Sequence, residues 1–162
     1  MTLTDLRKSK GLLIDTNLLV LLTIGTLSVD EISEDKRTRQ YTVDDFYLLL
    51  RIIDNCQSVV LTPNILTEAS NLLEGVSYKG IDALSVLKGV AERSEEQYMN
   101  SLSIMQAHAK IYTKFGLSDA VIYAMAQEDF AVVTQDLKLY SYLEGMGLNV
   151  LNFNNFRTGN LR

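Results

Sequence analysis

The stretch GLLIDTNLLVLLTIG, residues 11–25, is the most apolar part of this chain, yet Asp15, Thr16 and Asn17 lie inside it. The apolar run before Asp15 predicts a buried strand, and the run after it predicts a helix. An isolated buried carboxylate costs free energy unless it is paired, hydrogen-bonded or bound to a metal. Asp15 is therefore expected at the exit of the strand, where polar partners can reach it.

The chain has 162 residues, of which 47% are hydrophobic, and a formal net charge of −5. This length and composition predict a single domain, residues 1–162, with a real core. The lone Cys56 cannot form an intramolecular disulfide and is expected to pack at a helix end, which fits a reducing, cytoplasmic location. No apolar run approaches the roughly 20 residues that span a bilayer, so no membrane contact is expected. The negative charge argues against a broad basic surface that binds nucleic acid through phosphates alone, although a metal site reverses the local field.

Short apolar segments alternate with helical patterns along the rest of the chain. Strands are predicted at residues 58–62, 130–134 and 149–153, and helices at 42–56, 63–75, 117–129 and 136–147. Thr42 is the expected cap of the first of these helices, and Pro63 suits the first turn of the second. Residues 28–40 carry mixed charge and predict an exposed loop or short helix, whereas residues 80–115 read as helical throughout. This alternation indicates an α/β domain with a parallel sheet, whose working site lies beyond the carboxyl ends of the strands.

Four acidic residues are candidates for that site: Asp15, Glu68, Asp119 and Asp136. Each also has an ordinary structural interpretation. Asp15 and Asp136 follow predicted strands and can cap the next helix. Glu68 can be a solvated helix residue, and Asp119 can complement a helix dipole, with Ser118 or Asp119 as the cap.

Taken together, the four carboxylates predict one acidic cluster at the edge of the sheet. Carboxylates that converge without cations repel one another and raise one another's pKa. Divalent metal is the usual solution, and hard oxygen ligands suit Mg²⁺ or Mn²⁺. Asn17 adds an oxygen ligand near Asp15, and Thr134 can hydrogen-bond a carboxylate. Such a site is typical of metal-assisted phosphodiester hydrolysis.

The chain resembles the PIN-domain ribonucleases. The segments that carry the resemblance are LLIDTN (12–17), LTPNILTEASNLL (61–73), LSDAVIYAMAQEDFAVVTQD (117–136) and GLNVLNF (147–153). The Asp, Glu, Asp and Thr-x-Asp fall in the family's order, and the match spans most of the chain. LSDA followed by a strand and VT-x-D is the most telling part.

This resemblance implies a three-layer α/β/α sandwich with a central parallel sheet, and Mg²⁺- or Mn²⁺-dependent cleavage of single-stranded RNA. Carried over by motif, the metal-binding carboxylates are Asp15, Glu68, Asp119 and Asp136, supported by Asn17 and Thr134. Many small members are toxins held by an antitoxin, and many form homodimers, so both partners are implied here. The segments 28–40 and 75–115 lengthen the spacing beyond that of compact toxins and are interpreted as inserted or extended.

Other interpretations remain open at this stage. A phosphatase can use Asp15 as its nucleophile, although Asn17 stands where the dehalogenase-like pattern has a second Asp. A PIN-like scaffold protein without catalysis is the non-enzymatic alternative. Lys114 and Lys138 are candidates for contact with RNA phosphates, and some tyrosines can stack on bases. The single histidine, His108, reads as an ordinary helix residue rather than a zinc ligand.

Overall fold

A computed structural model describes residues 3–157. It contains seven strands within that range: β1 (Leu12–Ile14), β2 (Val59–Leu61), β3 (Ser77–Tyr78), β4 (Ile81–Asp82), β5 (Glu95–Glu96), β6 (Ala131–Thr134) and β7 (Val150–Asn152). The helices of the described part are α1 (Leu3–Leu6), α2 (Thr16–Leu27), α3 (Glu31–Glu34), α4 (Val43–Ile53), α5 (Pro63–Leu73), α6 (Ala83–Glu92), α7 (Ser101–Ala107), α8 (Ala109–Phe115), α9 (Leu117–Ala126), α10 (Leu137–Gly145) and α11 (Phe153–Arg157).

The central sheet is parallel and has the strand order β5-β2-β1-β6-β7. The chain builds outward from β1 through β2 to β5, and then returns to place β6 on the other side of β1. The strand order therefore reverses between β1 and β6. In open α/β sheets, ligands bind beyond the carboxyl ends of the strands at such a reversal.

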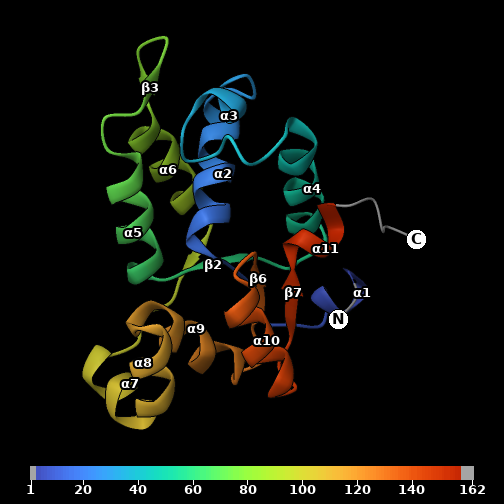
Figure 1. The fold of residues 1–162 in the computed structure, drawn as a ribbon, viewed down its shortest axis with the longest axis vertical. Helices are drawn as coiled ribbons and strands as arrows, with labels where there is room; N and C mark the ends of the chain where they lie inside the picture. The colour runs from blue at the N-terminus through green and yellow to red at the C-terminus, as the bar shows by residue number, and fades with distance from the viewer. Residues whose placement is uncertain (1–2, 158–162) are drawn as a thin grey trace.

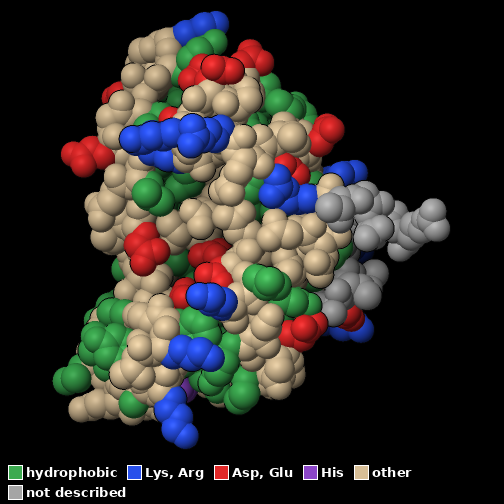
Figure 2. Space-filling view, viewed as in Figure 1, with side chains coloured by type: hydrophobic (Ala, Val, Ile, Leu, Met, Phe, Trp, Pro, Cys, Tyr) green, Lys and Arg blue, Asp and Glu red, His purple; other side chains and the backbone are tan. Residues whose placement is uncertain are grey.

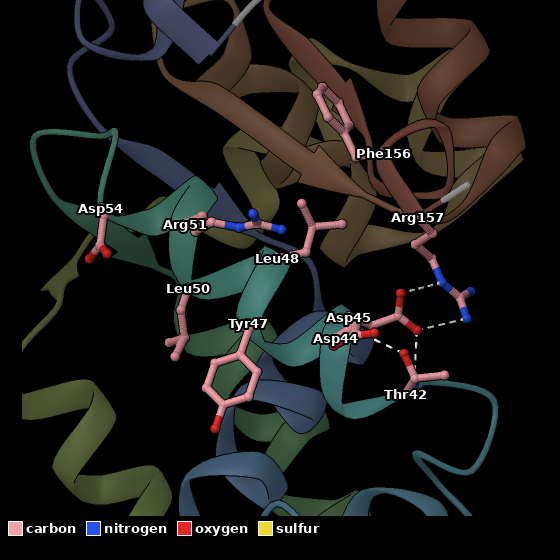
Figure 3. Close-up of a pocket in the computed structure, with 10 residues that line it drawn as sticks. All are labelled: Thr42, Asp44, Asp45, Tyr47, Leu48, Leu50, Arg51, Asp54, Phe156 and Arg157. Carbon is pink, nitrogen blue, oxygen red and sulfur yellow. Dashed lines mark hydrogen bonds and ion pairs between the residues drawn. The ribbon is translucent and has the colours of Figure 1, made fainter. Parts of the chain in front are cut away.

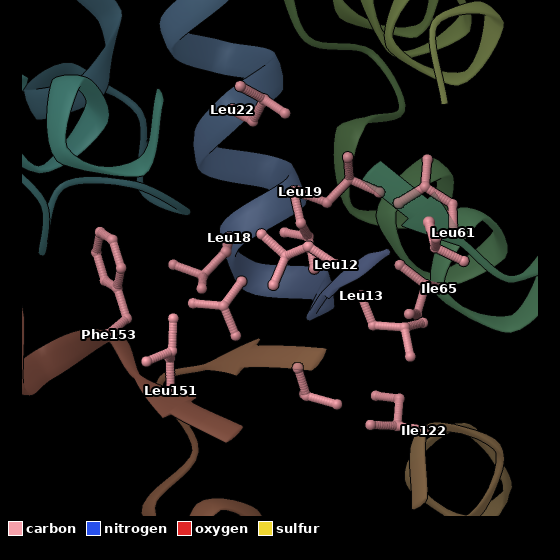
Figure 4. Packing of buried hydrophobic residues seen from close by; sticks show 14 of the residues in the cluster. Leu12, Leu13, Leu18, Leu19, Leu22, Leu61, Ile65, Ile122, Leu151 and Phe153 are labelled. Carbon is pink, nitrogen blue, oxygen red and sulfur yellow. The ribbon is translucent and has the colours of Figure 1, made fainter. Parts of the chain in front are cut away.

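Helices cover both faces of the sheet. In Figure 1, α2 to α6 lie on one side of it and α7 to α10 lie on the other, which confirms the predicted three-layer α/β/α sandwich. The helix α2 is buried almost all round because α3, α4, α5 and α6 pack against it. Figure 4 shows side chains from α2, β1 and β7 pointing into one cluster, including Leu18, Leu13 and Leu151. A helix that is apolar on every side is stable only at such a position.

Local signals explain where the long helices begin. Thr42 caps α4 as the sequence predicts, and Asp45 completes a reciprocal capping box with it. Thr62 caps α5 and Pro63 occupies its first turn, where the missing N–H is no loss. Gly25 lets α4 approach α2, because a β-carbon there would lie 2.3 Å from the Phe46 ring.

The prediction that residues 80–115 are helical throughout is wrong. A two-stranded hairpin, β3–β4, precedes α6, and β5 adds a fifth strand to the main sheet by pairing Glu95 with Val60. Residues 28–40 contain a short helix as predicted, but they are not simply exposed, since Ile32 and Thr38 are fully buried. Tertiary pairing and packing, rather than local sequence pattern, decide both segments.

Candidate active site

Asp15 and Thr134 meet where the strand order reverses. Ile14 pairs with Val133 in parallel register, so the residues that follow β1 and end β6 are adjacent. The backbone N–H of Asp15 donates to the carbonyl of Val133 at 3.1 Å, which extends the ladder by one bond. The Thr134 hydroxyl then donates to Asp15 Oδ2 at 2.6 Å. This direct hydrogen bond is the kind of contact that the predicted supporting role of Thr134 requires.

Asp15 is held firmly but its charge is not neutralised. Its Oδ1 accepts from the Thr16 backbone N–H at 2.7 Å, so each carboxylate oxygen has one donor. Burial is the largest influence and raises the pKa of Asp15. The two hydrogen bonds lower that pKa, and the charges of Asp136 and Glu68 raise it again. The hydrogen bonds fix the orientation of the carboxylate, and burial together with the neighbouring charges leaves its pKa raised overall.

Thr134 also shapes the turn that carries Asp136. Its hydroxyl oxygen accepts from the Asp136 backbone N–H at 3.0 Å while its hydrogen goes to Asp15. Asp136 caps α10 through Oδ1, which accepts from the N–H groups of Lys138 and Leu139 at 2.7 and 3.0 Å. The capping interpretation of Asp136 is therefore confirmed. Its exposed Oδ2 accepts no hydrogen bond from residues 3–157, which leaves it available to a ligand.

Glu68 reaches the site from α5 through a contact that sequence analysis missed. Its Oε2 accepts from the Thr16 hydroxyl at 2.8 Å. Thr16 thus serves two carboxylates, since its backbone binds Asp15 and its side chain binds Glu68. The position of Thr16 between Asp15 and Asn17 was the one sequence signal that it belongs to the site. No local sequence pattern indicated that its hydroxyl would face α5.

Asp119 lies in the first turn of α9 and is not its cap. Gly116 holds the N-cap position with φ at 93°, a conformation that suits glycine, and the proposed caps at Ser118 or Asp119 are wrong. The Asp119 side chain is half-buried. Burial, followed by the charges of the other three carboxylates, raises the pKa of Asp119 to about 7. Asp119 therefore lies close enough to all three to be repelled by them.

The structure brings together the four predicted carboxylates, but no side chain of residues 3–157 forms an ion pair with any of them. Burial is the largest cause of the raised pKa values of Asp15 and Asp119, and repulsion among the four carboxylates adds to it. The available donors are carboxylate oxygens and threonine hydroxyls, which are hard ligands. A divalent cation such as Mg²⁺ or Mn²⁺ fits both the charge and the donor chemistry.

The cluster is not a closed metal cage. Within residues 3–157, no group of three Asp, Glu, His or Cys side chains is arranged to hold a metal ion together. Mg²⁺ usually keeps several waters and takes only one or two protein carboxylates, with substrate phosphate completing its coordination. An open arrangement of this kind suits a cation that is shared with a substrate.

A polar clamp, made of Tyr41, Asp45, Gln135, Asn154 and Arg157, borders one side of the cluster. The buried Tyr41 hydroxyl donates to the Gln135 side chain, and Asn154 Nδ2 donates to the Gln135 carbonyl at 3.1 Å. Gln135 is the middle residue of the turn between Thr134 and Asp136, so the clamp holds that turn. Burial raises the pKa of Tyr41 and keeps its hydroxyl protonated as a donor.

The clamp ends in an ion pair between α4 and α11. Arg157 Nε donates to Asp45 Oδ1 at 3.0 Å, and its Nη2 lies 3.0 Å from Oδ2 (Figure 3). Arg157 Nη2 also donates to the Gln40 carbonyl at 2.6 Å, and the guanidinium lies 5.1 Å from the centre of the Tyr41 ring. Asp45 is buried, so this pair is shielded from water on one side.

A surface hollow of about 760 Å³ borders the other side. Its lining comes from α8 and α10, namely Lys114, Phe115, Leu137, Lys138, Ser141 and Tyr142. Figure 2 shows acidic side chains gathered near the middle of this face, with basic and apolar side chains below them. A smaller hollow of about 360 Å³ lies between α5 and α9, where Glu68 and Ser118 contribute to its walls.

Three other predicted residues have less to do with the cluster. Asn17 is exposed and its side chain makes no hydrogen bond within residues 3–157, so its supporting role stays a prediction. His108 is not an ordinary helix residue, because it forms the break between α7 and α8 and contacts the Tyr123 ring edge-on at 5.3 Å. Cys56 is half-buried against the core just beyond α4, as expected of a packing residue.

The fold and the site define an α/β domain with an acidic cluster at its strand reversal. No protein-family model matches the chain, and no curated protein matches its sequence. Helices long and apolar enough to cross a membrane do not occur among the residues that the structure describes.

Proposed function

We propose that the protein is a metal-dependent endoribonuclease of the PIN type, which hydrolyses phosphodiester bonds of single-stranded RNA. The observation that carries the proposal is the convergence of Asp15, Glu68, Asp119 and Asp136 at the strand reversal. Those residues come from four separate segments of the chain, and a purely structural role for each would not require them to meet. The resemblance in the four quoted segments supports the same conclusion.

The side chains divide the work between orientation and binding. Thr134 and the Thr16 backbone fix the Asp15 carboxylate, and the Thr16 hydroxyl fixes Glu68. Asp119 and the free oxygen of Asp136 complete an oxygen-lined site for Mg²⁺ or Mn²⁺. When bound, such a cation activates water and neutralises charge on the phosphate. The fixed carboxylates would hold the cation and the scissile phosphate in one place.

The resemblance extends the proposal to the protein's setting. A toxin held by an antitoxin protein, a homodimer and a cytoplasmic location belong to the proposal on that ground. Asn17 speaks against the phosphatase alternative, because the dehalogenase-like pattern has a second Asp at that position. A scaffold role without catalysis is the outcome that the following experiment would leave.

The test is cleavage of total cellular RNA with Mn²⁺ or Mg²⁺ by the wild type, with the wild type in EDTA, Asp119→Asn and Asp129→Asn run beside it. Asp129 is an exposed aspartate at the opposite end of β6, and its φ of 68° suits asparagine, so this variant makes the same chemical change outside the site. We expect Asp119→Asn to lose activity by a factor on the order of a hundred or more. Asp129→Asn should cleave like the wild type.

Three outcomes of the same experiment would count against the proposal. Cleavage that survives EDTA would refute the metal, and equal cleavage by Asp119→Asn would refute the site. If the wild type cleaves RNA with neither Mn²⁺ nor Mg²⁺, the scaffold interpretation would remain.

A further inference from the structure

The hollow between α8 and α10 has an unusual composition for this acidic chain. The chain carries a net charge of −5, yet two lysines, Lys114 and Lys138, line one small depression together with aromatic and apolar side chains. Leu137 lies on its rim with 63% of its side chain exposed. Exposed apolar surface rimmed by polar or charged side chains often marks a binding site.

Neither lysine forms an ion pair with an acidic side chain of residues 3–157. Lys138 follows Asp136 by two residues, but only its backbone N–H binds that carboxylate, and its exposed ammonium forms no ion pair within residues 3–157. The Lys114 ammonium lies 5.0 Å from the Phe115 ring centre and 5.4 Å from the Tyr142 ring centre. Both positive charges therefore remain available to an anion outside the chain.

The rings of Phe115 and Tyr142, which lie below the Lys114 ammonium, form an apolar wall of the hollow. Phe115 and Tyr142 contact each other edge to face at 5.3 Å, and Tyr142 also contacts Tyr123 at 5.9 Å. These ring contacts hold Tyr142 in place. Its hydroxyl makes no hydrogen bond in the described part of the chain, so ring contacts rather than a hydrogen bond fix its position. The Lys114 ammonium lies over these ring faces, and its flexible side chain can give way to a base while staying close to the flanking phosphate. An aromatic wall beside lysine ammonium groups has the features of a stacking site for a nucleic-acid base.

The position of the hollow relates it to the acidic cluster. Leu137 and Lys138 directly follow Asp136 on α10, and Phe115 lies four residues before Asp119. Each of the two walls of the hollow therefore lies within a few residues, along the chain, of one of the four carboxylates. A chain whose phosphate lies at the cluster would have its next nucleotide within reach of the hollow.

We propose that this hollow binds one nucleotide of a single-stranded nucleic acid next to the bond that is cleaved. The base lies against Phe115, Tyr142 and Leu137, and the flanking phosphates lie near Lys114 and Lys138. This inference rests on the proposed nuclease function and adds a reason for the single-stranded preference. A base inside a duplex is already stacked on its neighbours and cannot enter a side hollow without being flipped out.

The first experiment measures binding without cleavage. Asp119→Asn in Mg²⁺ is titrated against a fluorescein-labelled oligouridylate of about ten nucleotides, followed by fluorescence anisotropy. Adding Lys114→Glu and Lys138→Glu should weaken binding tenfold or more, and the plot of log Kd against log salt should become shallower by about 1.4 for two lost phosphate contacts. Lys36→Glu is the matched control, because Lys36 is an exposed lysine beyond α3, away from α8 and α10 (Figure 1).

The second experiment separates the base from the phosphates. A strand of the same length that lacks bases should bind more weakly, by roughly five- to a hundredfold. This difference should persist in Tyr142→Phe, which keeps the ring, and should shrink in Tyr142→Leu, which removes it. A thermal melt of each variant shows whether it is folded, and Leu137→Ser provides a second variant at an exposed position.

The outcomes separate this inference from the proposed function. Unchanged affinity and salt slope in the lysine variant, or equal binding of strands with and without bases, would overturn the nucleotide site even where the wild type cleaves RNA. A polyglutamate peptide that binds as tightly as the RNA would overturn it in favour of an acidic protein partner. The expected binding effects without any wild-type cleavage would support the site and refute the nuclease, and a wild type that neither binds nor cleaves would refute both.

Discussion

The two sides of the acidic cluster are built in opposite ways. On one side, the polar clamp satisfies almost every polar group with a partner far away in sequence: Tyr41 binds Gln135, 94 positions later, and Asp45 binds Arg157, 112 positions later. On the other side, the rings of the hollow are held by edge contacts, and its two lysine ammonium groups form no ion pair with the part of the chain that the structure describes. The difference indicates that the clamp fixes the site, whereas the hollow is free to bind.

This contrast predicts a large difference in stability between two charge deletions. Arg157→Ala leaves Asp45 buried without its partner and should lower the free energy of unfolding by about 2–3 kcal/mol, at the lower end for a broken buried pair because Arg157 is partly exposed. Lys138→Ala removes a charge that stabilises nothing in the folded chain and should stay within about 0.5 kcal/mol of the wild type. Urea denaturation measures both, and equal effects of the two substitutions would contradict the contrast.

A pair of tyrosines tests the same comparison at finer scale. Tyr41→Phe removes the hydroxyl that holds Gln135 and should cost about 1–2 kcal/mol of stability. Tyr142→Phe removes a hydroxyl that makes no hydrogen bond within residues 3–157 and should cost close to nothing. Denaturant midpoints of the two variants give the answer directly.

The Tyr41 substitution also has a consequence for catalysis under the proposed function. A looser Gln135 allows the turn between Thr134 and Asp136 to move, so kcat should fall while KM for RNA stays unchanged. A rise in KM alone would instead place Tyr41 in substrate binding. No change in either constant would show that the clamp is not needed to position the turn.

The sequence predicts the elements that carry the acidic cluster better than it predicts the contacts on either side of the cluster. The strand ends at Asp15 and Asp136, the cap at Thr42 and the proline at Pro63 are all local signals, and each is where the structure has it. The parallel sheet then follows from the alternation of strands and helices, and the rule about carboxyl ends brings the acidic residues to one edge. The four candidate carboxylates could therefore be named before their geometry was known.

The parts that could not be predicted depend on contacts between distant segments. The strand β5 consists of Glu95 and Glu96, which have no intrinsic preference for a strand and form one only by pairing with β2. The bond between Thr16 and Glu68 and the bond between Tyr41 and Gln135 depend on how helices dock, which no local pattern encodes. The hollow was partly visible, since Lys114 and Lys138 stood out as charges, but its wall of rings required the fold.

The smallest expected effect concerns the cluster between the two sides. The pKa of Asp119 rises from 3.8 to about 7 on folding, so folding favours its protonated form. Its contribution to stability is therefore full below about pH 4 and is lost as the pH rises through about 7. In EDTA, the stability of Asp119→Asn relative to the wild type should increase over this range, by about 1 kcal/mol once partial exposure and screening are discounted. Asp129→Asn should keep a constant difference, because its side chain lies outside the cluster.

Adding Mn²⁺ or Mg²⁺ should change the stability of the wild type and of the variants by different amounts. A cation that binds the ionised carboxylates stabilises the folded wild type by an amount that grows with the logarithm of the cation concentration above its Kd, and most strongly where the carboxylates are already charged. Wild-type stability at pH 8 should therefore rise with added cation, while Asp119→Asn should respond less. Since the clamp keeps Asp136 in place with or without a cation, Arg157→Ala should blunt this response as well. A response to cation that is identical in all three proteins would show that the cation binds elsewhere.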